Sequence, residues 1–138
     1  MTRTFVLVWI LLALSACDAS FGRRWDIGGP IAGATPEAFE SRILEAVSTY
    51  GAKEGLACVS GGHLPVECYL QPVRVWAVAG AHGATVCYAA MGVPFERGEY
   101  EARMKALGAE LDAQVGGGRV TVTAGGCPPP PSFSRQSD

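Results

Sequence analysis

Apolar residues recur at intervals of three or four between residues 36 and 50, which is the spacing of one face of an α-helix. Thr35 stands where an N-cap is needed, and Pro36 suits the first helical turn. Gly51 and Gly55 offer places for the helix to end. The pattern predicts an amphipathic helix whose buried face consists of Phe39, Ile43, Ala46, Val47 and Tyr50.

A second apolar stripe begins after a start that lies between Pro94 and Glu99. Its residues follow one another in steps of four, three, four and four, so they share one helical face. We interpret this face as a packing surface rather than a cofactor site. Glycines at 116–118 end the helix, and the strict alternation of residues 119–124 predicts a final strand. The stripe consists of Tyr100, Met104, Leu107, Leu111 and Val115.

Short apolar segments between the two helices are typical of strands joined by glycine-containing loops. The segments are 56–60, 65–71, 73–79 and 84–91. Pro72 leaves one ambiguity, because it either separates two strands or kinks one long strand. In the first case the loops that contain His63 and His82 lie at the same end of the sheet, and in the second they lie at opposite ends.

These elements predict an α+β fold in which two helices pack on one face of a small, mostly antiparallel sheet, in the order α-β-β-β(-β)-α-β. We expect the folded domain to span residues 35–127. Residues 128–138 begin with four consecutive prolines and continue with polar residues. This composition predicts a proline-rich, disordered tail.

The stretch from Phe5 to Cys17, "FVLVWILLALSAC", is apolar almost throughout and follows the basic residue Arg3. It is too short for a permanent membrane span, and it has the form of an export signal. The residues "LSAC" at 14–17 resemble the lipobox of bacterial lipoproteins. The resemblance implies a signal peptide at 1–16, cleavage before Cys17 and fatty acids attached to Cys17. An ordinary signal peptide that leaves a free Cys17 is the alternative.

A lipid-anchored chain of this kind faces the periplasm from a bacterial membrane. Asp18, directly after Cys17, slightly favours the inner over the outer membrane, again by resemblance to bacterial lipoproteins. Residues 17–34 are rich in glycine and lack a sustained period, so we expect an acylated N-terminus and a flexible tether. Trp25 and Ile27 are expected to dock onto the domain.

The charge balance argues against nucleic acid as a partner. The chain has 11 basic and 13 acidic residues, a formal charge of −2, and removal of the signal takes away Arg3 and leaves −3. Proteins that bind nucleic acid usually carry a basic patch, and none stands out here.

The number of cysteines, five, leaves four if Cys17 carries lipid. In an exported chain these four predict two disulfides, although three pairings are formally possible. If Ser60 pairs with Val66 in a hairpin, Cys58 lies opposite Cys68, which supports a bridge between them. Trp76 would face Cys87 in the next hairpin and cover a second bridge, Cys87–Cys127. A zinc site is the competing interpretation, but the chain lacks C-x₂-C spacing.

Candidate chemistry is sparse. His63 and His82 could bind a metal with Glu67, but structural and catalytic sites usually need three or four ligands. Ser60 and His63 have no identified acidic partner, and the common nucleophile, phosphate-binding and dinucleotide motifs are missing. We therefore predict no enzymatic activity, no cofactor and no metal.

Binding is the remaining class of function. Residues 58–68, with His63 between two cysteines, resemble periplasmic lysozyme inhibitors, which present a histidine on a disulfide-bracketed loop to the enzyme. Lipid-anchored immunity proteins against cell-wall hydrolases are a related possibility. The order of elements also resembles ring-building modules of envelope secretion machines. We expect a non-catalytic interaction module of a membrane-associated complex, with His63, His82 and Trp76 as candidate binding residues; the alternative is an inhibitor or immunity protein that uses the His63 loop.

Overall fold

The computed structural model describes residues 19–29, 35–80, 82–116, 118–123 and 126–131. Cys17 and residues 132–138 lie outside these ranges. The elements follow the order β-α-β-β-β-β-η-α-β along the chain. They are β1 (Ala19–Gly28), α2 (Pro36–Lys53), β2 (Ala57–Ser60), β3 (Val66–Leu70), β4 (Val73–Gly80), β5 (Gly83–Gly92), the 3₁₀ turn η1 (Pro94–Glu96), α3 (Arg97–Val115) and β6 (Val120–Thr123).

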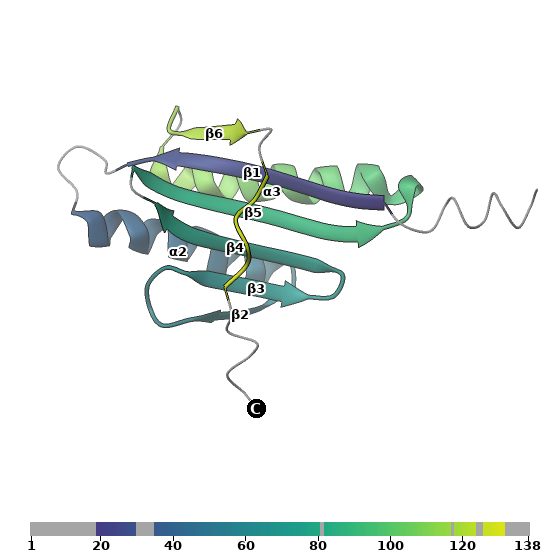
Figure 1. Cartoon of the computed structure of the whole chain (residues 1–138), viewed down its shortest axis with the longest axis horizontal. Helices are drawn as coiled ribbons and strands as arrows, with labels where there is room; N and C mark the ends of the chain where they lie inside the picture. Colours follow the sequence, from purple (N-terminus) through teal and green to yellow (C-terminus); the bar gives the residue numbers. More distant parts are fainter. Residues whose placement is uncertain (1–18, 30–34, 81, 117, 124–125, 132–138) are drawn as a thin grey trace, which may run out of the picture.

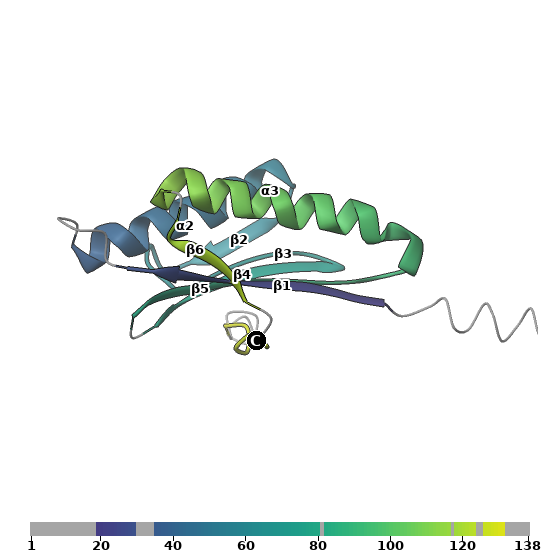
Figure 2. The same ribbon diagram turned by 90° about the horizontal axis from the view of Figure 1, so that it is seen from above.

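The strands form a single sheet in the order β2-β3-β4-β5-β1-β6, and all pairings among them are antiparallel. Both helices lie on one face of the sheet (Figures 1 and 2). The predicted α+β architecture is therefore confirmed. In the described part of the chain, no helix is long and apolar enough to cross a membrane.

The core lies between the helices and the sheet. Every residue of the two predicted apolar stripes is buried, and Thr35 caps α2 by accepting a hydrogen bond from the Ala38 amide at 3.1 Å. The ring of Phe21 in β1 stacks on Tyr100 of α3 with a centroid separation of 4.8 Å. Burial of these side chains is the main favourable contribution to folding.

β1 corrects the expectation of a flexible tether over residues 17–34. Residues 19–28 form a ten-residue strand between β5 and β6. Phe21, Trp25 and Ile27 point to the helices and are at most 4% exposed. Arg23 is a charged residue at an alternate position between Phe21 and Trp25. Glu101 of α3 neutralises it, with Arg23 Nη2 and Glu101 Oε2 2.7 Å apart. The folded domain therefore includes β1 and does not start at residue 35.

The chain turns at Gln71 and Pro72, between β3 and β4. The loops that hold His63 and His82 consequently lie at the same end of the sheet. β1 begins at the other end, where Ala19 pairs with Gly92 at the close of β5. Figure 1 shows this arrangement, with the start of β1 and the end of β5 together.

The four prolines of the expected tail, residues 128–131, also belong to the fold. Residues 126–131 cross the sheet on the face opposite the helices, running perpendicular to the strands (Figures 1 and 2). We call residues 126–131 the strap. Proline suits this role because it lacks an amide donor that would otherwise need a partner, while its carbonyl can still accept a hydrogen bond.

Candidate functional site

The sheet face opposite the helices, here called the open face, has a row of side chains that crosses four strands. The register aligns Arg24 of β1 with Cys87 of β5, Cys87 with Trp76 of β4, and Trp76 with Glu67 of β3. Residues directly opposite in neighbouring strands share a face. The strap lies over this row.

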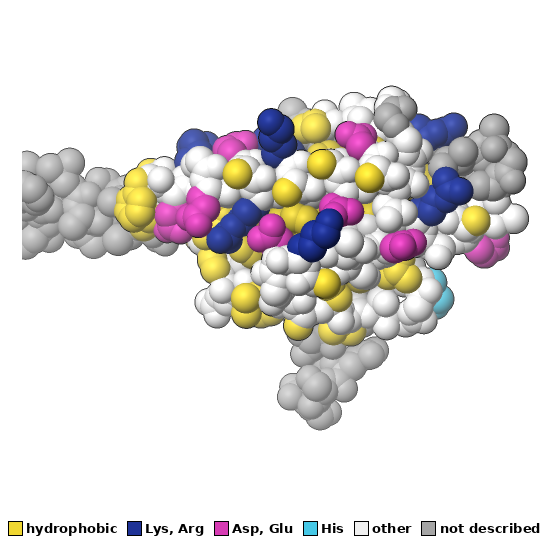
Figure 3. All heavy atoms as spheres, turned by 180° about the vertical axis from the view of Figure 1, so that it is seen from behind, with side chains coloured by type: hydrophobic (Ala, Val, Ile, Leu, Met, Phe, Trp, Pro, Cys, Tyr) yellow, Lys and Arg dark blue, Asp and Glu magenta, His cyan; other side chains and the backbone are white. Residues whose placement is uncertain are grey.

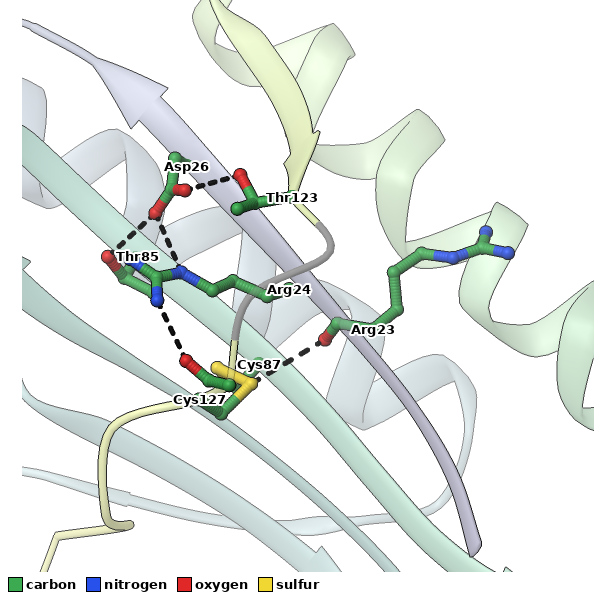
Figure 4. Close-up of polar contacts among 8 residues, drawn as sticks. Arg23, Arg24, Asp26, Thr85, Cys87, Thr123 and Cys127 are labelled. Atoms are coloured by element: carbon green, nitrogen blue, oxygen red, sulfur yellow. Dashed lines mark hydrogen bonds and ion pairs between the residues drawn. A yellow bond between two sulfur atoms is a disulfide. The ribbon is translucent and has the colours of Figure 1, made fainter.

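Three contacts hold the strap to the row. Cys127 forms a disulfide with Cys87, whose side chain is fully buried. Arg24 donates from Nη1 to the Gly126 carbonyl at 2.7 Å, and Trp76 donates from Nε1 to the Pro128 carbonyl at 3.2 Å. Figure 4 shows the disulfide and the Arg24 contact side by side. The predicted opposition of Trp76 and Cys87 is confirmed, and the indole is only 5% exposed.

The carboxylate of Asp26 fastens β6, the strand that precedes the strap. Asp26 of β1 accepts hydrogen bonds from the hydroxyls of Thr123 and Thr85 and pairs with Arg24, whose Nε lies 3.0 Å from Oδ1 (Figure 4). The hydrogen bond from Thr123 is the largest influence on the carboxyl group, and together with Arg24 and Thr85 it lowers the pKa of Asp26 despite the opposing effect of burial. A carboxylate held in its charged form by these donors is suited to latch β6 onto β1, not to exchange protons near neutral pH.

Glu67 is the buried charged residue at the far end of the row, 7% exposed. Its Oε1 lies 3.3 Å from Nε of Arg74 in β4, and the Arg74 guanidinium also lies 5.1 Å from the centroid of the Tyr69 ring. Arg74 is thereby held flat against the open face, and its charge offsets that of Glu67.

A hollow of about 620 Å³ lies beside the strap on the open face. Gly22 and Ala89, which are paired in the register, belong to its lining, and their small side chains leave this space unfilled. Trp76 and Cys127 line it on the strap side. A neighbouring hollow of about 340 Å³ shares Ala89 and extends to Arg74. We call these two hollows together the groove.

The groove has apolar and cationic parts but lacks a paired nucleophile and base among its lining residues. Its lining combines Arg24 and Arg74 with the apolar side chains of Trp76 and Ala89. Such a surface fits a polypeptide segment that combines an apolar side chain with a carboxylate.

The Cys58–Cys68 disulfide is present, as the hairpin register predicts. It lies on the helix side of the sheet, directly under α2. A Cβ atom placed on Gly51 would come within 2.4 Å of Cys58 Sγ and 2.9 Å of Cys68 Sγ. The bridge therefore joins the edge strand β2 to the core, and Gly51 is the residue that lets α2 approach it.

His63 and His82 occupy separate loops at one end of the sheet, and both are exposed. His63 Nδ1 lies 3.1 Å from the carbonyl oxygen of its neighbour Leu64, which is buried. The His82 carbonyl accepts a hydrogen bond from the Gly29 amide at 3.2 Å, which joins that loop to the end of β1. Across the described ranges, no three His, Cys, Asp or Glu side chains gather as a metal site would require.

A smaller cavity of about 140 Å³ lies between the helices and the sheet, next to Tyr50, Tyr88 and Arg103. Burial raises the pKa of Tyr50, and it raises the pKa of Tyr88 to about 12 although Arg103 opposes the shift. The Tyr50 hydroxyl donates to the Arg103 carbonyl at 3.0 Å. Both phenols are neutral near pH 7, which suits a structural role better than proton transfer.

Sequence reasoning identified the cysteines and Trp76 but missed Gly22, Ala89, Arg24 and Arg74. The signal for β1 was present in Phe21, Trp25 and Ile27, since alternating apolar residues indicate a half-buried strand. The groove itself had no sequence signal, because its lining residues come from strands that are far apart along the chain.

Comparison with protein-family models, with curated proteins and with solved structures finds no match for this chain.

Proposed function

We propose that this protein is a lipid-anchored, disulfide-stapled protein of the bacterial envelope, which acts as a non-catalytic interaction module of a membrane-associated complex. The sequence "LSAC" at 14–17 supplies the anchor, and the groove on the open face supplies the binding surface. The groove is the main support for the interaction role, because it is a preformed hollow bounded by a strap that a disulfide holds in place.

The two disulfides support an oxidising compartment outside the cytoplasm. Such bonds persist mainly in exported proteins, and small domains use them to supplement a limited core. Here they fasten the edge strand β2 and the strap to the rest of the domain. Both segments gain rigidity, and a rigid surface loses less conformational entropy when it binds a partner.

The residues at the groove support binding rather than catalysis. Ala89 and Gly22 leave room for an incoming side chain, and the two flanking cations, Arg24 and Arg74, are already held by Asp26 and Glu67. A partner segment with an acidic residue would add a charge-assisted hydrogen bond to either guanidinium group.

The test is capture of envelope proteins by the full acylated chain from detergent-solubilised membranes, with Ala89→Trp as the variant that fills the groove. Ala106→Trp on the exposed side of α3 is the matched control. We expect the wild type and the control to recover the same membrane-complex subunits and Ala89→Trp to lose them, with unchanged circular dichroism. Equal recovery by all three proteins would remove the groove from the proposal.

An inhibitor or immunity protein against a cell-wall hydrolase remains the second candidate. It is favoured by the position of His63, which is exposed in the loop between β2 and β3 at the end of the sheet opposite the start of β1. An anchored chain would present that end toward the periplasm. Capture of a secreted hydrolase, together with loss of inhibition in His63→Ala, would favour this candidate over the interaction module.

A further inference from the structure

We propose that the end of the domain where β1 begins rests directly on the bilayer, with the ring of Phe95 placed among the lipid headgroups. This inference rests on the proposed function, since it requires acylation of Cys17. It adds an orientation that the lipid anchor alone does not determine.

The connection between the anchor and the sheet is short. One residue, Asp18, separates Cys17 from Ala19, where β1 begins. Two residues span at most about 7 Å even when fully extended. β1 pairs with β5 along its whole length, from Ala19 opposite Gly92 to Gly28 opposite Gly83, so it is a part of the sheet and not a loose spacer. An acylated Cys17 therefore brings this end of the sheet to the membrane surface.

Apolar side chains are exposed at the end of the sheet where β1 begins. Phe95 in η1 is 88% exposed, the highest value among the large hydrophobic side chains that the structure describes. Met91, near the end of β5, is 50% exposed. The pairing of Ala19 with Gly92 places both residues close to the start of β1. Figure 3 shows hydrophobic atoms at this end of the molecule.

Phe95 is held in its outward position by a closed turn. The Val93 amide donates to the Glu96 carboxylate at 3.2 Å, and the Glu96 amide donates to the Val93 carbonyl at 3.0 Å. Pro94 restricts the backbone between them. A ring fixed outward by its own turn costs little additional entropy when it enters a lipid surface.

Charges near the ring fit a headgroup layer of mixed sign. The exposed Arg97 follows η1, and its guanidinium lies 5.4 Å from the centroid of the Phe21 ring, within reach of a lipid phosphate. Glu99, two residues further along the helix, pairs with Arg103 at 3.5 Å. Because basic and acidic side chains are both present, we expect this end of the domain to rest on zwitterionic as well as anionic bilayers.

The opposite end of the domain then faces away from the membrane. That end contains the loops of His63 and His82, and the groove lies between it and the bilayer, beside the strap. The proposed seating thus predicts that partners enter the groove close to the membrane surface.

The experiment uses the full acylated chain in phosphatidylcholine vesicles, with Phe95 replaced by the photoreactive residue p-benzoylphenylalanine. The same replacement at Val59 and at Val122 provides matched controls, since these exposed apolar residues are 51% and 61% accessible and lie in the edge strands. Metabolic labelling with a palmitate analogue measures acylation of Cys17 separately. After irradiation, lipid adducts are counted by mass spectrometry.

We expect labelled protein whose adduct yield at position 95 exceeds that of both controls several-fold. Labelled protein with equal yields at the three positions would overturn the seating and leave the proposed function standing. Absence of label from the protein would overturn the lipid anchor and the seating together.

Discussion

The indole nitrogen of Trp76 donates a hydrogen bond to the carbonyl oxygen of Pro128, and the two atoms are 3.2 Å apart. This bond joins the centre of the sheet to a segment 52 residues later. It shows that the strap is a packed part of the domain and that Trp76 is a structural residue as well as a wall of the groove.

Replacement of Trp76 by Phe should destabilise the protein by about 1 kcal/mol, because the partly buried Pro128 carbonyl loses its donor while most of the apolar contact remains. Tyr69→Phe is the control, since that side chain is 42% exposed, and we expect a change within about 0.5 kcal/mol. Urea denaturation measures both values. Equal stability of Trp76→Phe and wild type would show that the strap bond contributes nothing.

Removal of the two disulfides should have distinguishable effects. The Cys87–Cys127 bridge spans 40 residues and the Cys58–Cys68 bridge spans 10, so the chain-entropy model predicts losses of about 4 and about 3 kcal/mol. The double variant Cys87→Ser with Cys127→Ser should also release the strap and shift Trp76 fluorescence to the red. The double variant Cys58→Ser with Cys68→Ser should leave that emission unchanged, and a red shift in both would contradict the assigned contacts.

Gly51→Ala should destabilise the protein by about 1–3 kcal/mol through overpacking. The new methyl group would lie 2.4 Å from Cys58 Sγ, and the disulfide cannot move without displacing the edge strand. Gly98→Ala is the matched control in α3, because nothing lies within 4 Å of the added atom and alanine favours helix formation. Thermal unfolding should show a lower melting temperature for Gly51→Ala only.

The contribution of Asp26 should depend on pH. Its pKa in the folded protein lies below the ordinary value of 3.8, chiefly because Thr123 donates a hydrogen bond to the carboxylate. The stabilisation is therefore fully present above the pKa of the unfolded chain and is lost as the pH falls through the folded pKa. In urea denaturation, Asp26→Asn should be less stable than wild type at pH 7, and the difference should shrink below about pH 4. A difference in the free energy of unfolding between Asp26→Asn and wild type that stays constant with pH would rule out this link between the ionisation of Asp26 and stability.

Local patterns predicted a large part of this fold correctly. The stripe from Phe39 to Tyr50 and the stripe from Tyr100 to Val115 depend on spacing within one helix, so neighbouring residues suffice to reveal them. The opposition of Cys58 and Cys68 follows in the same way from the short hairpin that contains both residues. The N-cap at Thr35 likewise needs only its own helix.

What the sequence by itself determined are the two helices, the hairpin that contains His63 and the Cys58–Cys68 disulfide, because each rests on a period or on a single turn. Tertiary structure decided that Ala19–Gly28 is a strand, since its partners are β5 and β6. Arg23 becomes acceptable beside the strand's apolar residues only when Glu101 lies across from it. Tertiary structure also decided the turn at Pro72 and the strap. These features depend on contacts between segments that are far apart along the chain, and such contacts produce no periodic pattern in the sequence.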